Sequence, residues 1–393
     1  MYIADGIVIV NNEIEDVCFI YDKNIGLKYN INVDSFILIN YINENPECSV
    51  ESLIEEFTGI EEFLKFLISN HIIQRNQTKY KHKIKHIVKE NAVRLFIECT
   101  DKCNLSCLHC YGSFGRNNHN FINLEVLRKV IKDAAELNVY EVDITGGEPF
   151  LYPHIEEIFS LLFEYGMITT LFTNLTVCTE KDITLIKEYG IKTVVTSIES
   201  YDYVVHDEFR GLKGAWRKTV DNILLLKEMG VDIKVNFVLG NHNIVDAEKT
   251  IDSICKLGVC CNIDITTPEG RAANSMFDVD KALKILKRYN DGSIAKNCGV
   301  FKRMLFIAAN GDVFPCPSIR KDEFRIGNIN QEITIKDWYI KMFSFMKGFV
   351  CNENCGVGEC KGGCRARALA FHKCINAPDD YFCEIYEVNN NYV

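Results

Sequence analysis

The chain has 393 residues, of which 47% are hydrophobic and 11% aromatic, so it is long enough for about two or three domains with a sizeable buried core. Its formal net charge of −10 at pH 7 excludes general nucleic-acid binding, because neutralising phosphates requires a basic surface. Neither a signal peptide nor an apolar stretch of membrane-spanning length is present. We therefore expect a cytoplasmic protein with no nucleic-acid or membrane partner.

The first 75 residues predict a small winged-helix-like domain. Apolar runs separated by Asn, Asp and Gly turn signals predict strands over residues 6–10, 17–21 and 27–31. Apolar residues at helical spacing predict helices over 34–43, 50–57 and 60–70, followed by a short strand at 72–73. Residues 76–90 contain five lysines and a single acid, Glu90, and are predicted to be a solvated linker.

Strand and helix patterns then alternate six times. The predicted strands cover residues 94–98, 141–145, 168–173, 193–198, 232–238 and 261–266. The predicted helices cover 124–137, 155–165, 184–189, 215–229 and 246–257. This alternation favours an α/β fold, a parallel sheet covered by helices. A full or partial barrel closes such a sheet, and its chemistry lies in the loops that follow the strands.

The cysteine distribution indicates metal ligation. Only Cys18 and Cys48 precede residue 99, whereas eight of the 18 cysteines lie between Cys298 and Cys383. Disulfides form in oxidising compartments and fit a chain without an export signal poorly. Cys103, Cys107 and Cys110, which we call the triad, follow the first barrel strand. Closely spaced thiolates bind iron-sulfur clusters, and three ligands leave a fourth iron open. Zinc with a distant fourth ligand is the alternative.

The run Thr145-Gly146-Gly147-Glu148-Pro149 follows the second barrel strand. Two glycines let a ligand approach the backbone closely, although an ordinary tight turn has the same composition. Together, the C-x3-C-x2-C triad and this run resemble the radical S-adenosylmethionine (SAM) enzymes. The resemblance implies a partial (β/α)6 radical SAM barrel over residues 91–278. It also implies that SAM is cleaved to a 5′-deoxyadenosyl radical, which takes hydrogen from an unactivated carbon.

The resemblance to radical SAM enzymes also implies roles for individual residues. Cys103, Cys107 and Cys110 would ligate a [4Fe-4S] cluster whose open iron is chelated by SAM. The remaining cofactor-binding positions are Gly146, Gly147 and Glu148 at the SAM amino group, His109 near the adenine, Ser197 and Glu199 at the ribose, and Arg210 near the SAM carboxylate. Glu199 stands where many members have an aspartate, and solvated loop polarity is the alternative for Ser197, Glu199 and Arg210.

The C-terminal cysteines resemble the SPASM domain, which binds two auxiliary iron-sulfur clusters in peptide-modifying radical SAM enzymes. The domain would span residues 279–393, with Cys351, Cys355, Cys360 and Cys383 on one cluster and Cys298, Cys316 and Cys364 on the other. The usual C-x2-C-x5-C run is here C-x3-C-x4-C, so Cys355 is displaced by one residue. Cys374, Cys260, Cys261 or a non-cysteine group could complete the second set, or it could stay open. A structural zinc ribbon is the alternative.

Residues 1–75 resemble, in order and size, the recognition element of enzymes that modify ribosomally made peptides, which is similar to the peptide chaperone of pyrroloquinoline quinone biosynthesis. That element binds an unmodified leader segment, often as an added strand at a sheet edge. A winged-helix DNA reader is the alternative, and the acidic helices disfavour it. The family also implies an electron donor such as a flavodoxin or ferredoxin.

These observations predict a radical SAM peptide maturase that forms a thioether cross-link, as sactipeptide and ranthipeptide synthases do. Carbon-carbon or carbon-oxygen cross-linking is the next interpretation. Epimerisation is a third, with Cys178, Cys255 or Cys260 returning a hydrogen atom. An anaerobic sulfatase-type maturase is a further enzyme alternative, and an iron-sulfur scaffold that only binds peptides is the non-enzymatic one. The sequence identifies neither the precursor nor the residues joined.

Overall fold

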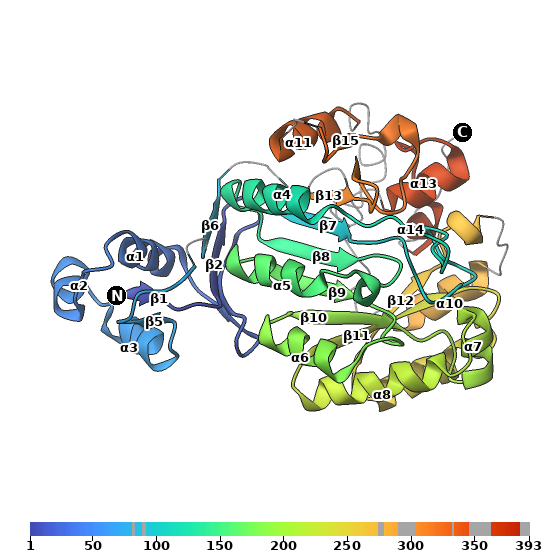
Figure 1. Ribbon diagram of the computed structural model, residues 1–393, viewed down its shortest axis with the longest axis horizontal. Helices are drawn as coiled ribbons and strands as arrows, with labels where there is room; N and C mark the ends of the chain where they lie inside the picture. The colour runs from blue at the N-terminus through green and yellow to red at the C-terminus, as the bar shows by residue number, and fades with distance from the viewer. Residues whose placement is uncertain are drawn as a thin grey trace.

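A computed structural model describes residues 1–80, 83–88, 92–273, 279–289, 300, 303–331, 334–345 and 363–385. Its N-terminal unit contains two sheets and three helices (Figure 1). The strands are β1 (Tyr2–Ile3), β2 (Ile7–Asn12), β3 (Val17–Asp22), β4 (Leu27–Asn30), β5 (Ile73–Gln74) and β6 (Ile84–Ile87). The helices are α1 (Val33–Glu44), α2 (Val50–Glu56) and α3 (Glu61–Ser69). The three strands and three helices predicted before residue 71 are all present.

The N-terminal sheet has the strand order β4-β3-β2-β6, and its strand β2 is buried on both faces. Because side chains alternate along a strand, Ile7 and Ile9 of β2 pack with the three helices. Val8 and Val10 point the other way and pack against Tyr140 and Ile168, which lie where barrel strands begin. The N-terminal unit therefore abuts the N-terminal ends of the barrel strands.

The prediction of a solvated linker over 76–90 is wrong for part of that range. Residues Ile84–Ile87 form β6, which pairs in parallel with β2. Lys83 and Lys85 are buried, with relative exposures of 4% and 0%. Lys85 Nζ donates to the carbonyl of Tyr165 at 3.0 Å, and Lys83 Nζ pairs with Asp5 at 2.9 Å. The lysine run is thus tolerated inside the fold because its ammonium groups reach carbonyl and carboxylate oxygens.

The barrel provides the main sheet, whose strands run in the order β12-β11-β10-β9-β8-β7-β13-β14-β15. Its six core strands are parallel: β7 (Arg94–Glu98), β8 (Glu141–Thr145), β9 (Ile168–Phe172), β10 (Thr193–Ser197), β11 (Asp232–Leu239) and β12 (Cys260–Ile265). The helices between them are α4 (Leu124–Glu136), α5 (Ile155–Glu164), α6 (Glu180–Glu188), α7 (Tyr203–Arg210), α8 (Ala215–Glu228) and α9 (Ala247–Lys256). The partial α/β barrel is confirmed, and α7 is an additional helix that periodicity did not predict.

The C-terminal part extends this sheet on its other side. It comprises α10 (Val279–Tyr289), β13 (Met304–Ile307), β14 (Asp312–Phe314), β15 (Gly327–Asn328), α11 (Ile335–Ser344), α13 (Arg365–His372) and α14 (Asp380–Ile385). Strand β13 pairs in parallel with β7, so the strands of this region lie beside the strand that precedes the triad, whereas α10 packs near β12. Among the described helices, none combines the length and apolar character needed to cross a membrane.

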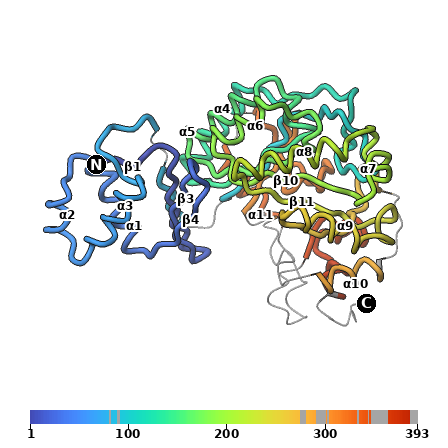
Figure 2. Tube along the Cα trace, turned by 90° about the horizontal axis from the view of Figure 1, so that it is seen from below, coloured from blue at the N-terminus to red at the C-terminus, as the bar shows by residue number. Residues whose placement is uncertain are grey.

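Two perpendicular views place the N-terminal unit and α7 at opposite ends of the molecule (Figures 1 and 2). Lys23 joins the N-terminal unit to the barrel, because its Nζ donates to the carbonyls of Met167 (2.9 Å) and Leu162 (3.4 Å) at the end of α5. Together with Lys85, it places amino groups at the C-terminal end of α5, where the helix dipole favours their protonated form.

The two buried lysines predict a pH-dependent stability. Burial, with the charge of Lys85, lowers the pKa of Lys23 to about 7, and burial lowers that of Lys85 to about 7. An unfolded lysine titrates near pH 10.4, so between about pH 7 and pH 10 the unfolded state binds more protons. The free energy of unfolding should therefore rise with pH across this window.

Chemical denaturation at several pH values checks this expectation. Lys23→Met should show a smaller rise than the wild type, whereas Lys65→Met, which changes an exposed lysine of α3, should match the wild type. Equal slopes in all three proteins would contradict a buried, titrating Lys23.

Candidate functional site

The triad lies in the loop that follows β7. Cys103 and Cys107 are buried and Cys110 is half-buried. Backbone N–H groups are directed at two of the sulfurs, from Leu105 to Cys103 Sγ and from Phe114 to Cys110 Sγ, both at 3.4 Å. Such N–H donors stabilise thiolate ligands and tune the potential of an iron-sulfur cluster.

Gly146 and Gly147 let the loop after β8 lie directly against the segment that leads to the triad. A Cβ atom on either glycine would overlap a backbone carbonyl, that of Thr100 or that of Lys102. Gly147 N–H donates to Thr100 O at 2.7 Å. A carbonyl oxygen, and not this N–H, is therefore the backbone group of Gly147 that could bind a ligand.

Glu148 connects the ends of two neighbouring strands. Its buried carboxylate accepts hydrogen bonds from Thr173 Oγ1 and from the N–H of Asn174, both at 2.8 Å, and from the N–H of Phe150 at 3.2 Å. Burial raises the pKa of Glu148 to about 7. Because its oxygens are used in this way, Glu148 supports the loops around the site.

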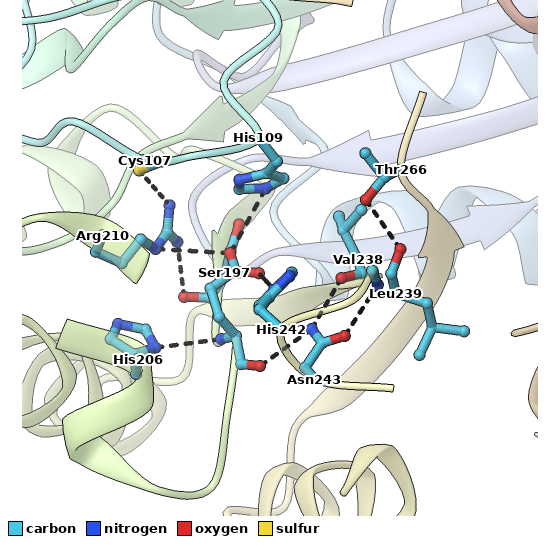
Figure 3. Close-up of polar contacts among 12 residues, drawn as sticks. Cys107, His109, Ser197, His206, Arg210, Val238, Leu239, His242, Asn243 and Thr266 are labelled. Atoms are coloured by element: carbon cyan, nitrogen blue, oxygen red, sulfur yellow. Dashed lines mark hydrogen bonds and ion pairs between the residues drawn. The ribbon is translucent and has the colours of Figure 1, made fainter. Parts of the chain in front are cut away.

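Glu199 lies two residues after β10 and is completely buried. Figure 3 shows the three residues that contact its carboxylate, His109, Arg210 and His242. Its Oε1 lies 3.6 Å from His109 Nε2 and 3.6 Å from Arg210 Nε. Its Oε2 lies 3.4 Å from His242 Nε2. The structure thus brings together His109, Glu199 and Arg210, which the sequence predicted as site residues from three separate segments.

The site contains an ionised carboxylate. Burial alone would raise the pKa of Glu199, but His109, Arg210 and His242 lower it well below its usual range. Burial lowers the pKa of His109 and lowers that of His206 to about 4. Arg210, whose guanidinium is always charged, is the permanent cation beside Glu199.

Arg210 joins this centre to the triad. Its Nη1 donates to Cys107 Sγ at 3.3 Å and its Nη2 to the carbonyl of Ser197 at 2.9 Å. Ser197 therefore contributes a backbone oxygen to the centre. Helix α7 ends beside the triad loop because Gly211 adopts φ 68°, and Ser106 N–H donates to Arg210 O at 3.0 Å.

Several residues of the site carried no sequence motif. His242 stacks on Phe209 with ring centroids 3.6 Å apart, and Asn243 Nδ2 donates to the carbonyl of Glu199 at 3.1 Å. Arg271 donates to the carbonyls of Cys107 and Phe114, both at 2.7 Å. One signal was available: each of these residues follows a predicted strand at its C-terminal end, where a barrel holds its chemistry.

The cysteines predicted for auxiliary clusters are only partly described. Cys298, Cys351, Cys355 and Cys360 lie outside the described residues. Cys316 follows β14 and is half-buried, Cys364 directly precedes α13, and Cys383 is buried in α14. Cys374 is exposed between α13 and α14, and Cys255 and Cys260 are also exposed, whereas Cys178 is half-buried.

The side chains around the triad are suited to an iron-sulfur cluster with a polar ligand beside it. Among the described side chains, buried atoms without a hydrogen-bond partner include Glu199 Oε1, Arg210 Nε, His109 Nδ1 and His206 Nε2. Buried polar atoms are normally paired, so this group is suited to a polar ligand. In the same part of the chain, no three His, Cys, Asp or Glu side chains converge on one metal ion. A cubane cluster does not require such convergence, because each thiolate binds a different iron.

Comparison with known families agrees with this arrangement. Residues 97–254 match the radical SAM superfamily, and residues 298–361 match SPASM, described as an iron-sulfur cluster-binding domain. The chain thus carries a radical SAM domain followed by a SPASM extension, which identifies it as a radical SAM enzyme.

Two similar sequences and one solved structure show which proteins this chain resembles. The chain is 26% identical over 305 residues to the subtilosin biosynthesis protein AlbA of Bacillus subtilis, covering 70% of this chain and 68% of AlbA. It is also 26% identical to an AdoMet-dependent heme synthase of Methanosarcina barkeri, covering 72% of this chain and 94% of that protein. The structure of Streptococcus suis SuiB bound to its precursor peptide SuiA is 16% identical, with a TM-score of 0.66, and covers 98% of this chain and 99% of SuiB. SuiB therefore has a similar fold across nearly the whole chain.

Proposed function

We propose that this enzyme modifies a ribosomally made precursor peptide, most specifically by forming a thioether cross-link. The observation that carries the proposal is the likeness in fold to SuiB, because it extends over 98% of the chain and so includes the N-terminal unit. The match to the heme synthase leaves more than a quarter of this chain uncovered. The match to AlbA leaves a similar share uncovered, so the precursor peptide bound in the SuiB structure, and not the coverage, favours a peptide over a tetrapyrrole as substrate.

In this proposal the triad holds the [4Fe-4S] cluster and the surrounding polar groups hold SAM. When bound, the reduced cluster and SAM supply the 5′-deoxyadenosyl radical that takes a hydrogen atom from the substrate. Arg210 provides the positive charge for the SAM carboxylate, Glu199 accepts from the ribose, and His109 lies near the adenine. Ser197, Gly146 and Gly147 contribute backbone carbonyl groups, and Glu148 supports the loop that carries the glycines.

The C-terminal cysteines are proposed to hold two auxiliary clusters. Cys351, Cys355, Cys360 and Cys383 would complete one, and Cys298, Cys316 and Cys364 would leave an open iron on the other. An open iron suits a substrate thiolate, which favours a thioether product. In that reaction an S–H and a C–H bond break and an S–C bond forms. One hydrogen atom would leave with 5′-deoxyadenosine, the thiol proton would be released to solvent, and the remaining electron would pass to the auxiliary cluster that binds the thiolate. A flavodoxin or ferredoxin is the proposed electron donor.

Co-expression with a short Cys-containing reading frame beside this gene tests the reaction. Thioether formation predicts the loss of two hydrogen atoms per cross-link, together with loss of one alkylatable thiol. The same mass loss with all thiols intact would instead indicate carbon-carbon or carbon-oxygen cross-linking. An unchanged mass with altered stereochemistry would indicate epimerisation, and conversion of a side chain to an aldehyde would indicate a sulfatase-type maturase.

The leader is proposed to bind at the open edge of the N-terminal sheet. Strand β4 is the end of that sheet, and Leu27 is 50% exposed there. Ile31 N–H donates to Cys18 O, so the alternation of an antiparallel ladder directs the N–H of Lys28 and Asn30 outwards. A peptide added as a strand would bond to these groups.

Proline at position 28 removes one outward donor and leaves the β3–β4 ladder bonds in place. We therefore expect Lys28→Pro to weaken precursor binding by about fivefold, since a lost hydrogen bond costs roughly 1 kcal/mol. Lys28→Ala, which keeps the N–H, is the matched control. Calorimetric titration with the precursor measures both, and equal affinities would rule out strand addition at this edge.

A further inference from the structure

Arg320 lies four residues after Cys316 and inserts its side chain into the barrel end. Its Nη1 donates to Glu98 Oε1 at 3.3 Å, and its Nη2 contacts Glu98 Oε2. Its Nε donates to the carbonyl of Pro317 at 2.7 Å. All three guanidinium nitrogens are thus engaged, one with its own loop and two with the barrel.

Glu98 is the last residue of β7, the strand that leads to the triad. It is 2% exposed, and its Oε1 also accepts from the N–H of Ala309 at 3.1 Å. A buried carboxylate needs a cation, and removing one partner of such a pair leaves an uncompensated buried charge. Arg320 is the cation that Glu98 contacts.

The guanidinium also lies against three aromatic rings. Its Cζ is 5.1 Å from the ring centroid of Tyr111, 5.4 Å from that of Phe114 and 4.7 Å from that of Phe306. These distances are those of cation–π contacts. Tyr111 directly follows Cys110, and the N–H of Phe114 bonds to Cys110 Sγ. The Arg320 side chain therefore packs directly against the triad loop.

Arg320 itself belongs to the loop that carries Cys316. Ser318 N–H donates to Cys316 Sγ at 3.4 Å, and Ile319 N–H donates to Cys316 O at 3.1 Å. Arg320 closes this turn through Pro317 O. A single side chain thus connects the turn around Cys316 to the loop around Cys110 and to the strand before the triad.

We propose that Arg320 is a positioning residue that fixes the Cys316 loop against the triad loop, and so sets the spacing between the auxiliary cluster and the SAM-binding cluster. This inference rests on the cluster ligands in the proposed function. It concerns the placement of the two loops, because Arg320 donates to oxygen atoms and to no cysteine sulfur among its described contacts.

Spectroscopy of reconstituted Arg320→Gln tests the proposal. We expect iron and sulfide content to match the wild type, whereas spin–spin broadening between the reduced clusters decreases and at least one midpoint potential shifts. Amide hydrogen exchange at residues 111–114 and 316–320 should become about tenfold faster without any cluster or substrate. Arg325→Gln is the matched control, because Arg325 pairs with Asp312 from the same segment but is about half exposed.

The Arg320→Lys variant distinguishes a loss of loop positioning from a failure to fold. It keeps the charge that Glu98 requires but lacks the planar fork, so it should restore folding and only part of the spin coupling. If Arg320→Gln does not fold, Arg320→Lys carries the comparison. Broadening, potentials and exchange identical to the wild type would overturn the proposal. Wild-type protein that holds a single cluster would contradict the proposed cluster ligands as well as the role of Arg320. The iron content of the wild type therefore distinguishes a wrong ligand assignment from a failure of the Arg320 proposal alone.

Discussion

Replacing Cys103, Cys107 and Cys110 together with alanine is expected to remove one of three clusters and to abolish release of 5′-deoxyadenosine from SAM. The effect should be complete because the triad thiolates are the proposed protein ligands of the cluster that binds SAM. The auxiliary cysteines lie in a different part of the chain, so their clusters should remain. Iron and sulfide analysis after anaerobic reconstitution measures the loss.

Cys99→Ala is the control for the triad experiment. Cys99 lies four residues before the triad and is buried, but its Sγ donates to the carbonyl of Thr145 at 3.2 Å. Its removal should therefore leave the iron content and SAM cleavage unchanged. Loss of all clusters in the triad variant, or of none, would refute the assignment of a separate SAM-binding cluster to the triad.

Replacing Glu199 with glutamine should have the second-largest effect, because it removes the carboxylate that pairs with the buried Arg210 guanidinium. Breaking a buried pair in this way typically costs about 3–5 kcal/mol. The same change removes the proposed ribose acceptor, so SAM affinity should fall by about tenfold or more. Chemical denaturation and SAM titration of the reconstituted protein measure the two effects.

Asp221→Asn is the matched control for Glu199→Gln. Asp221 pairs with Arg217 at 2.9 Å on the exposed face of α8, and surface pairs of this kind contribute about 0–1 kcal/mol. Stability and SAM affinity should therefore change little. If the Glu199→Gln protein were as stable as the Asp221→Asn protein, the charge of Glu199 would not stabilise its packing with His109, Arg210 and His242.

Glu199 also makes a prediction about pH. Because its pKa lies well below the usual range, stability from its pairing should be constant near neutrality and be lost only as pH falls through the lowered pKa. This distinguishes Glu199 from Glu148, whose pKa of about 7 places its titration near neutral pH.

The barrel strands were predictable from sequence because burial on both faces gives continuous apolar runs. Strands β7 and β8 have the predicted bounds. Strand β6 was missed because Lys83 and Lys85 resemble a solvated segment, and only the fold provides the oxygens that their ammonium groups contact. Helix α7 was missed because His206, Asp207, Glu208 and Arg210 give it a polar sequence, although Phe209 and Arg210 are buried against the triad loop.

The triad and the glycines could be found from sequence because their spacing is local. The centre around Glu199 could be predicted only in part. Its His109 and Arg210 partners lie near recognisable motifs, but His242 comes from the loop after β11, and nothing in the sequence relates it to Glu199. Its contact depends on the parallel order of β10 and β11, which brings their C-terminal ends together.

Reductive cleavage of SAM is the most direct test of the account. Protein reconstituted anaerobically with iron and sulfide, then given SAM and a strong reductant, should release 5′-deoxyadenosine and methionine, and the triad variant should release neither. Wild-type protein that carries its clusters and binds SAM, yet releases no 5′-deoxyadenosine, would contradict the central claim that the triad supports radical chemistry.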